Sequence, residues 1–242
     1  MNKENPWERT EQLIGPRGIQ TLHTSNVTVV GLGGVGSYAV EALARAGIGE
    51  LCLIDGDVLA WSNMNRQLLA THQTMGQAKV EAAARRIADI NPCCITTARN
   101  MRVTPENAAE LLEPRTDYII DAIDDLPAKA ALIAAAKAIG VPIISVLGTA
   151  RRLDPWTGFQ QADISTTHTC PLARALRKRL RLLGIETGVS VIYSPQPPHQ
   201  LPQATRESQE CRPPLGSISF VPGQAGLIAA GIVVNALLEK AN

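Results

Sequence analysis

The stretch VTVVGLGGVGSYAVEALARAGIGELCLIDGD, residues 27–57, sets the architecture of this chain. It opens with a β-branched run that is typical of a buried strand, and helix-forming residues follow from Tyr38 to Ala46. Four glycines separate the two segments: Gly31, Gly33, Gly34 and Gly36. A second apolar run then ends on Asp55. This order of strand, glycine turn, helix, strand and acid predicts a nucleotide-binding βαβ unit.

The glycines indicate a place where phosphate meets the main chain. Free N–H groups at the positive end of a helix bind phosphate, and a Cβ would stand in the way. Asp55 follows the second strand, where such folds place an acid against a ribose hydroxyl. The pattern favours nucleotide binding over a turn that serves packing alone, and it leaves NAD, FAD and ATP open.

The composition limits the classes of protein and partner. At 242 residues the chain can form one large domain or two small ones, and we expect a single domain over residues 1–242. Hydrophobic residues make up 45% and aromatic residues 3%, which suits helices packed on a parallel sheet. Because the net charge is only +1, a nucleic acid would have to bind a local basic patch.

Cysteines and apolar segments bear on metal content and location. The 5 cysteines include no CxxC pair, so we expect neither a disulfide framework nor a structural zinc site. The polar segment from Met1 to Arg9 lacks the apolar core of a signal peptide, which predicts a cytoplasmic protein. The apolar stretch from Ala225 to Leu238 is shorter than the ~20 residues that span a bilayer, so we expect a buried helix and no membrane partner.

Alternating strand and helix patterns predict an α/β fold: a doubly wound, mostly parallel, Rossmann-like sheet with helices on both faces, completed by a C-terminal extension of the same domain. We expect a helical arm over residues 5–25, broken at Gly15-Pro16, and a mobile proline-rich loop over residues 195–214. Strands are expected at 27–30, 51–54, 95–98, 118–123, 141–147, 189–193 and 217–221. Helices are expected at 38–46, 77–90, 104–112, 127–139, 171–183 and 226–238.

Charged residues follow the ends of successive elements. The carboxyl ends of parallel strands share one edge, so Gly33, Asp55 and Asp124 should meet in one crevice. Arg66 and Lys79 would add two cations there. Such a set suits a triphosphate, with Asp124 holding Mg²⁺ between phosphate oxygens. Taken singly, each residue can also be a solvated surface charge or a turn former.

The motifs GLGGVGS, LIDGD, SNMNRQ, GQAKVEAAARRIADINP and DAIDD resemble those of adenylating enzymes of the ubiquitin-activating type, in the bacterial branch of the molybdopterin and thiamine sulfur-carrier activators. The resemblance extends from about Arg9 to Leu238 and loosens between Pro195 and Pro214. NxNRQ followed by GxxK at this distance is not shared with NAD folds. The resemblance therefore implies ATP as the nucleotide.

Motifs in the later half resemble those of the tRNA threonylcarbamoyladenosine dehydratases: LDPWTGFQQADIS, THTCPLARALRKRLRLLGI, VSVIYS and LGSISFVPGQAGLIAAGIVV. This resemblance implies an enzyme that uses ATP and Mg²⁺ to adenylate a carboxylate in tRNA. Activation of a ubiquitin-like sulfur carrier is the alternative within adenylation, although those activators usually carry two zinc-binding CxxC pairs. A Rossmann module that binds NAD or acts only as a scaffold is the alternative of another class.

The resemblance also implies roles for individual residues. Arg66 and Lys79 would act on the phosphates, Asp124 would hold Mg²⁺, and Arg9 would match an arginine finger that reaches into the partner subunit's site, which implies a homodimer. The nucleotide would be held by Gly31, Gly33, Gly34, Gly36, Asp55, Asp57, Ser62, Asn63, Asn65, Gln67 and Asp125.

The chain departs from the dehydratase pattern at two places. The segment GTARR, residues 148–152, replaces a more glycine-rich turn, and Gln196 stands where an acid is common. Cys170 and Cys211 could form a thioester, as in eukaryotic relatives, but no activating base lies beside either in the sequence.

The helix expected at residues 171–183 carries a basic face. Its leucines fall on one side, so we expect four cations to face outward and contact tRNA phosphates: Arg174, Arg177, Lys178 and Arg181. From this helix alone, an ordinary solvated surface is an equal alternative.

Overall fold

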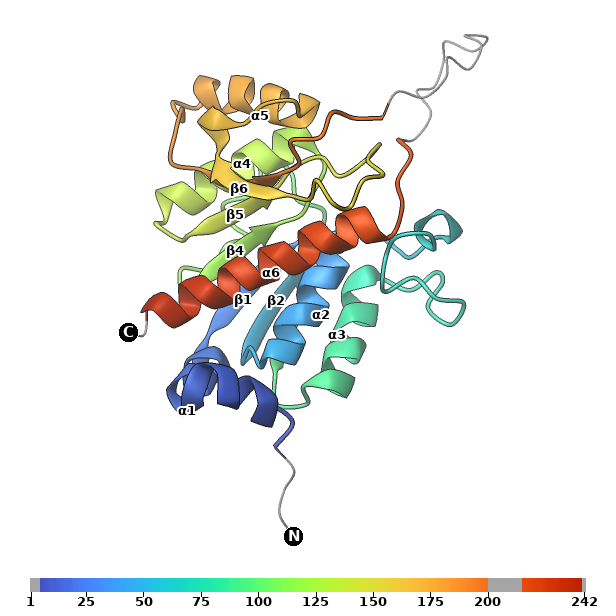
Figure 1. The fold of residues 1–242 in the computed structure, drawn as a ribbon, viewed down its shortest axis with the longest axis vertical. Helices are drawn as coiled ribbons and strands as arrows, with labels where there is room; N and C mark the ends of the chain where they lie inside the picture. Colours follow the sequence, from blue (N-terminus) through green and yellow to red (C-terminus); the bar gives the residue numbers. More distant parts are fainter. Residues whose placement is uncertain (1–4, 200–214, 241–242) are drawn as a thin grey trace.

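A computed structural model describes residues 5–199 and 215–240. Within them the chain forms a seven-stranded sheet in the order β3-β2-β1-β4-β5-β7-β6, with every pairing parallel except that of β6 with β7 (Figure 1). The strands are β1 Asn26–Val30, β2 Glu50–Ile54, β3 Ile95–Arg99, β4 Tyr118–Asp121, β5 Ile143–Val146, β6 Gln160–Asp163 and β7 Ser190–Tyr193. The predicted doubly wound, mostly parallel α/β sheet is confirmed.

Helices cover both faces of the sheet. They are α1 Glu8–Thr24, α2 Gly36–Ala46, α3 Lys79–Ile90, α4 Leu126–Ala138, α5 Pro171–Leu182 and α6 Phe220–Lys240. One apolar cluster joins the sheet to α1, α2, α3 and α6, and a second joins it to α4 and α5. Figure 1 shows α2, α3 and α6 on one face, with α1 at the end of that layer. The arm breaks as expected, since Gly15 has φ 73° within α1.

Two sequence expectations are wrong, and one strand was not expected. Residues 105–111 form turns instead of a helix, because the Asn107 side chain accepts from Thr104 N (2.8 Å) and donates to Arg102 O (3.0 Å), which competes with helical bonding. No strand forms at 217–221, because residues 217–219 are irregular and Phe220 and Val221 begin α6. The first turn of this helix accommodates Pro222, since the first N–H groups of a helix need no partner. The short antiparallel edge strand β6 was not expected.

The C-terminal helix α6 packs along α2. By length and composition alone it could cross a membrane, with a mean hydropathy of 1.7 in its most apolar window, half of which is buried in the structure. Core helices of soluble proteins also have this composition. Ala225, Ala229 and Val233 are fully buried against the sheet layer. A Cβ on Gly226 would lie 2.2 Å from Val35 O, so glycine is required for this approach.

A fully buried ion pair lies beneath the carboxyl ends of β4 and β5. Lys129 Nζ donates to Asp121 Oδ2 (2.8 Å), Ser145 Oγ (3.1 Å) and Val146 O (3.0 Å), and Ser145 Oγ donates to Asp121 Oδ2 (2.6 Å). Both charged side chains are 0% exposed. Breaking such a pair leaves a buried charge without compensation. The network therefore fixes α4 and the segment after Asp121 against the sheet.

We expect Lys129→Met to lower the free energy of unfolding by about 3–5 kcal/mol, because the Asp121 carboxylate would stay buried without its cation. Lys137→Met is the matched control, since Lys137 is an exposed lysine of the same helix that donates only to Gly188 O. Denaturant unfolding measures both. A loss below about 1 kcal/mol for Lys129→Met would contradict a structural role for the pair.

Candidate active site

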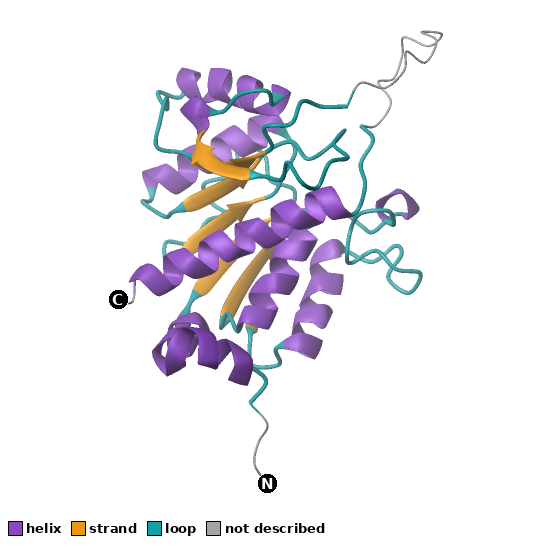
Figure 2. Cartoon of the chain, in the orientation of Figure 1, coloured by secondary structure: helices purple, strands orange, loops and turns teal. Residues whose placement is uncertain are grey.

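A cleft of about 670 Å³ opens at the carboxyl ends of the central strands. In Figure 2 loops gather beyond these strand ends, beside the start of α6. The cleft is lined by the glycine turn after β1, by residues 54–57 at the end of β2, by 122–125 after β4 and by 146–150 at the end of β5. Leu215, Ser217 and Pro222 close it from the α6 side. The predicted crevice is therefore present, and its walls come from distant parts of the chain.

The glycines of the turn have different roles. A Cβ on Gly36 would lie 1.8 Å from Gly31 O, and one on Gly31, where φ is +88°, would lie 2.9 Å from the Ala122 backbone. At Gly33 the nearest atom would be Gln67 Nε2 at 3.9 Å. Gly31 and Gly36 therefore permit close backbone packing, whereas Gly33 leaves the cleft floor open at the start of α2, where backbone N–H groups can bind an anion.

Asp55, Asp57 and Lys79 form one charged cluster at the end of β2. Lys79 is 5% exposed, and its Nζ lies 2.8 Å from Asp57 Oδ2 and 3.7 Å from Asp55 Oδ1. The hydrogen bond from Lys79 holds the pKa of Asp57 below its usual range. Asp55 also accepts from Leu32 N (2.6 Å) and Asp57 N (2.8 Å). Three predicted residues thus meet here, and Asp55 ties the second strand to the glycine turn.

The SNMNRQ segment contributes three cleft residues: Asn63, Arg66 and Gln67. Arg66 Nη1 donates to Ser62 O (2.8 Å) and Asn65 Oδ1 (2.9 Å), which leaves guanidinium donors for a ligand. Asn63 Oδ1 accepts from Ala60 N and so holds its own turn. The Gln67 Oε1 atom is buried and has no partner among the described residues. Ser62 and Asn65 do not line the cleft, and they support Arg66 from outside it.

The two neighbouring acids after β4 differ in their contacts. Asp125 Oδ1 accepts from Ala128 N (2.9 Å) and caps α4, so its first role is structural. Asp124 is exposed, lines the cleft, and accepts no hydrogen bond from the residues that the structure describes. Carboxylate oxygens are hard ligands, and Mg²⁺ needs only one or two of them besides phosphate oxygens. The position of Asp124 is therefore compatible with the predicted role as a ligand of Mg²⁺.

Several cleft residues were not predicted from the sequence. Met101 and Arg102 follow β3, and Arg102 Nη2 lies 3.7 Å from Asp57 Oδ1. Gly148, Thr149 and Ala150 follow β5. All five follow the carboxyl end of a strand, and that position is the sequence signal that would have identified them.

Arg9 lies far from the cleft of its own chain. It is exposed on α1, near Trp7, whose Nε1 donates to Arg45 O at the end of α2. The other end of α2 adjoins the glycine turn, and its 11 residues span about 16 Å. Arg9 therefore does not join Arg66, Lys79 and Asp124 within one chain.

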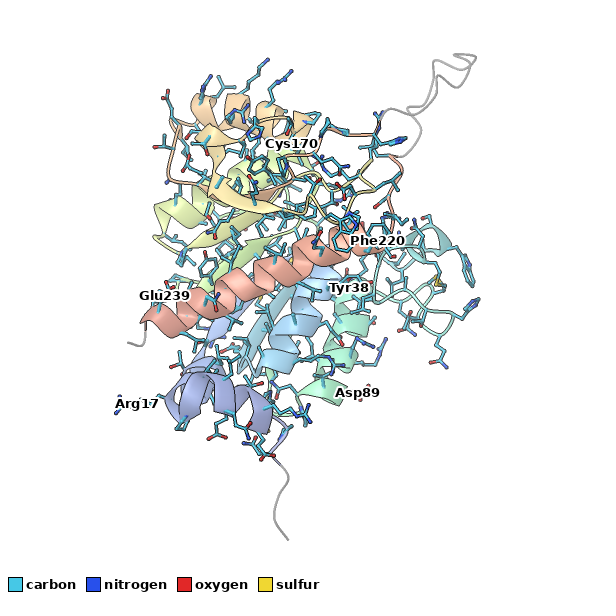
Figure 3. All side chains as sticks on the ribbon, viewed as in Figure 1. Arg17, Tyr38, Asp89, Cys170, Phe220 and Glu239 are labelled. Atoms are coloured by element: carbon cyan, nitrogen blue, oxygen red, sulfur yellow. The ribbon has the colours of Figure 1, made fainter. Side chains whose placement is uncertain are left out.

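The two cysteines considered as thioester nucleophiles are Cys170 and Cys211. Cys170, at the start of α5 in Figure 3, is 4% exposed, and Cys211 lies outside the described residues.

Of the α5 cations, Arg174, Lys178 and Arg181 are exposed. Arg177 is not, because its Nη1 turns back to donate to Thr167 O (2.9 Å) and to Thr167 Oγ1. The expectation that Arg177 faces outward is therefore wrong.

The described residues contain no group of three or more His, Cys, Asp or Glu side chains that could hold a metal ion without other ligands. A divalent cation at Asp124 would consequently need oxygens from a bound phosphate.

We expect Gly33→Ala to fold normally but to reduce nucleotide affinity at least about 10-fold, because its Cβ would enter the open floor of the cleft. Gly36→Ala should instead destabilise the protein, since its Cβ overlaps Gly31 O. Thermal unfolding and titration with a fluorescent nucleotide separate the two effects. If the folded Gly33→Ala protein binds the nucleotide with wild-type affinity, the glycine turn is not part of the nucleotide-binding site.

Comparison with known proteins places the chain in a family. It is 43% identical over 241 residues to the tRNA threonylcarbamoyladenosine dehydratase of Bacillus subtilis, covering 96% of this chain and 94% of that protein. The Escherichia coli enzyme of the same name is 36% identical, covering 96% and 93%. A crystal structure of the Escherichia coli enzyme in complex with ATP has a TM-score of 0.89 and 34% identity, over 100% of this chain and 98% of that one. The ThiF family profile matches residues 8–242, and this chain therefore belongs to the ThiF family.

Proposed function

We propose that this protein is an ATP-dependent enzyme that dehydrates threonylcarbamoyladenosine in tRNA to a cyclic form. The main support is 43% identity over nearly the full chain to an enzyme of that name. The cleft supplies the physical counterpart, because the glycine turn, Lys79, Arg66 and Asp124 all line it.

The reaction has two steps. An oxygen of the threonyl carboxylate attacks the α-phosphorus of ATP, and pyrophosphate leaves. The carbamoyl oxygen then attacks the activated acyl carbon, a carbamoyl nitrogen gives up its proton as the ring closes, and AMP leaves. One water is lost overall, with its oxygen carried away on AMP. Both steps gain from holding the reacting groups together and from stabilising the negative charge that develops at phosphorus.

Two cations of the cleft, Lys79 and Arg66, are held in place by hydrogen bonds and ion pairs before ATP binds. Lys79 is fixed between Asp55 and Asp57, and Arg66 is fixed by Ser62 O and Asn65. Both retain donors for phosphate oxygens. Fixed charges in a partly enclosed site stabilise a developing charge with little reorganisation. Asp55, at the end of β2, lies where a ribose hydroxyl would bind.

We infer that Asp124 holds Mg²⁺ when ATP is bound. Its exposed carboxylate lies in the cleft beyond the buried Asp121. When bound, Mg²⁺ would offset the negative charge of the phosphate oxygens. Lys129 fixes the strand end before Asp124 through its bond to Asp121, so the ligand is presented from a rigid segment.

Analysis of tRNA nucleosides tests the function. Cells that lack this protein should contain threonylcarbamoyladenosine in place of the cyclic form, and the wild-type gene should restore it. Normal levels of the cyclic form in such cells would refute the assignment. Pyrophosphate exchange into ATP that depends on a sulfur-carrier protein, and not on modified tRNA, would instead support the alternative adenylation reaction.

We also propose that the protein is a homodimer in which Arg9 completes the partner's site. In one chain Arg9 lies near the end of α2 away from the cleft, so a role for Arg9 at the phosphates requires a second copy of the chain. The resemblance to adenylating enzymes with a trans arginine supports this assignment. A positive charge from the partner would add to Arg66 and Lys79 at the phosphates.

Mixing variants tests the trans arrangement. Arg9→Ala and Lys79→Ala should each abolish most AMP formation, and subunit exchange between them should restore part of it. In a mixed dimer the Arg9→Ala chain keeps its own Lys79 and receives Arg9 from its partner. A proven mixed dimer without activity would exclude the trans role.

The exposed cations of α5 are proposed to contact tRNA phosphates. Arg174, Lys178 and Arg181 are exposed, and α5 begins beside the cleft, because Leu172 lines it. Each contact with a phosphate releases counterions, so binding should weaken as salt rises. A tRNA substrate also supports the cytoplasmic location expected from the sequence.

Salt dependence distinguishes phosphate contacts from ordinary surface charge. Lys178→Ala combined with Arg181→Ala should weaken tRNA binding and reduce the slope of log affinity against log salt by roughly 2, with ATP affinity unchanged. Arg177→Ala is the matched control, because this arginine bonds to Thr167 and should leave the slope unchanged. An unchanged slope in the double variant would mean that the exposed cations of α5 do not contact tRNA phosphates.

A further inference from the structure

Arg152 is a buried cation that the catalytic scheme above does not use. It is 3% exposed, and burial lowers its pKa. No carboxylate of the described residues lies within ion-pair distance of its guanidinium. Burying a charge without a counter-ion is costly, so the guanidinium must be held by other contacts.

These contacts join two loops at the edge of the cleft. Arg152 Nε donates to Gly148 O (3.0 Å), after β5, and Nη1 donates to Gln196 O, after β7. A Cβ on Gly148 would lie 3.6 Å from Cys170 Sγ, so the start of α5 packs against the same segment. Gly148, Thr149 and Ala150 line the cleft, whereas Arg152 stands behind them.

Backbone strain is concentrated at the same place. Among the described residues, the two non-glycine residues with positive φ are Arg151 and Thr169, both at 58°. Arg151 directly precedes Arg152, and Thr169 directly precedes Cys170. Arg151 N donates to Gly216 O (2.8 Å), and Thr169 Oγ1 donates to Pro195 O (2.9 Å). Such conformations persist only where surrounding contacts hold them, and they often occur at functional sites.

We infer that Arg152 is a positioning residue that fixes the cleft wall formed by residues 148–150 for the acyl substrate. The inference rests on the proposed function. The glycine turn, Asp55 and Lys79 lie at the ends of β1 and β2, where the nucleotide is proposed to bind. The 148–150 wall follows β5, beyond β4 in the sheet order, and Gly148 packs next to Leu172 of α5. By donating to Gly148 O, the Arg152 guanidinium therefore fixes the 148–150 wall, against which the modified nucleoside would bind.

Arg152→Met tests this role, because methionine fills much of the space but removes the charge and both hydrogen bonds. The KM for modified tRNA should rise about 10-fold or more, since small displacements of positioning groups are costly, while the KM for ATP stays within about twofold. Arg152→Lys keeps the charge and one donor group and should give an intermediate KM for tRNA. Lys137→Met, which loses a bond to Gly188 O away from the cleft, should match the wild type.

The two KM values separate positioning from general stability. If Arg152→Met lowers the melting temperature but leaves the KM for tRNA unchanged, or raises both KM values equally, the residue is only structural and the inference fails. If Arg152→Met does not fold, Arg152→Lys is subject to the same criteria. Failure of the proposed function is recognised separately, since the wild-type protein would then not convert modified tRNA at all.

Discussion

The close approach of Gly36 to the carbonyl of Gly31 is the contact on which the rest of the site depends. With no side chain at either position, α2 can start close to the end of β1, and Gly31 can lie against the backbone of Ala122 after β4. That packing leaves the floor at Gly33 open and aims the positive end of α2 into the cleft. The same turn is tied to the second strand through the bond from Leu32 N to Asp55.

The site is held by two charged networks of different character. Lys129 and Asp121 are fully buried and fix the scaffold below the cleft, whereas Lys79, Asp55 and Asp57 lie at its surface, where Asp57 is half exposed. The buried pair sets where the segment leading to Asp124 leaves β4. The surface cluster keeps a lysine in place before any ligand binds, so its charge needs no rearrangement when negative charge develops.

Sequence patterns predicted the features that local chemistry determines. The glycine turn, the acid after β2 and the lysine at the start of α3 were predictable because strand ends in a parallel sheet share one edge. The turns at 105–111 come from local bonds of the Asn107 side chain, which the helical pattern concealed. The outcome for Arg177 and the burial of Arg152 depend on contacts between separate segments, so no spacing reveals them. The pairing of Lys129 with Asp121 likewise exists only because α4 docks onto β4 and β5.

Transfer of a carboxylate oxygen to AMP is the most direct test of adenylation. Modified tRNA with ¹⁸O in the threonyl carboxylate would be incubated with the protein and ATP, and the products analysed by mass spectrometry. With both carboxylate oxygens labelled, attack on the α-phosphorus predicts AMP that carries one ¹⁸O, a cyclic nucleoside that keeps the other, and unlabelled pyrophosphate. Formation of the cyclic nucleoside with unlabelled AMP, or with ADP and labelled phosphate, would contradict the account.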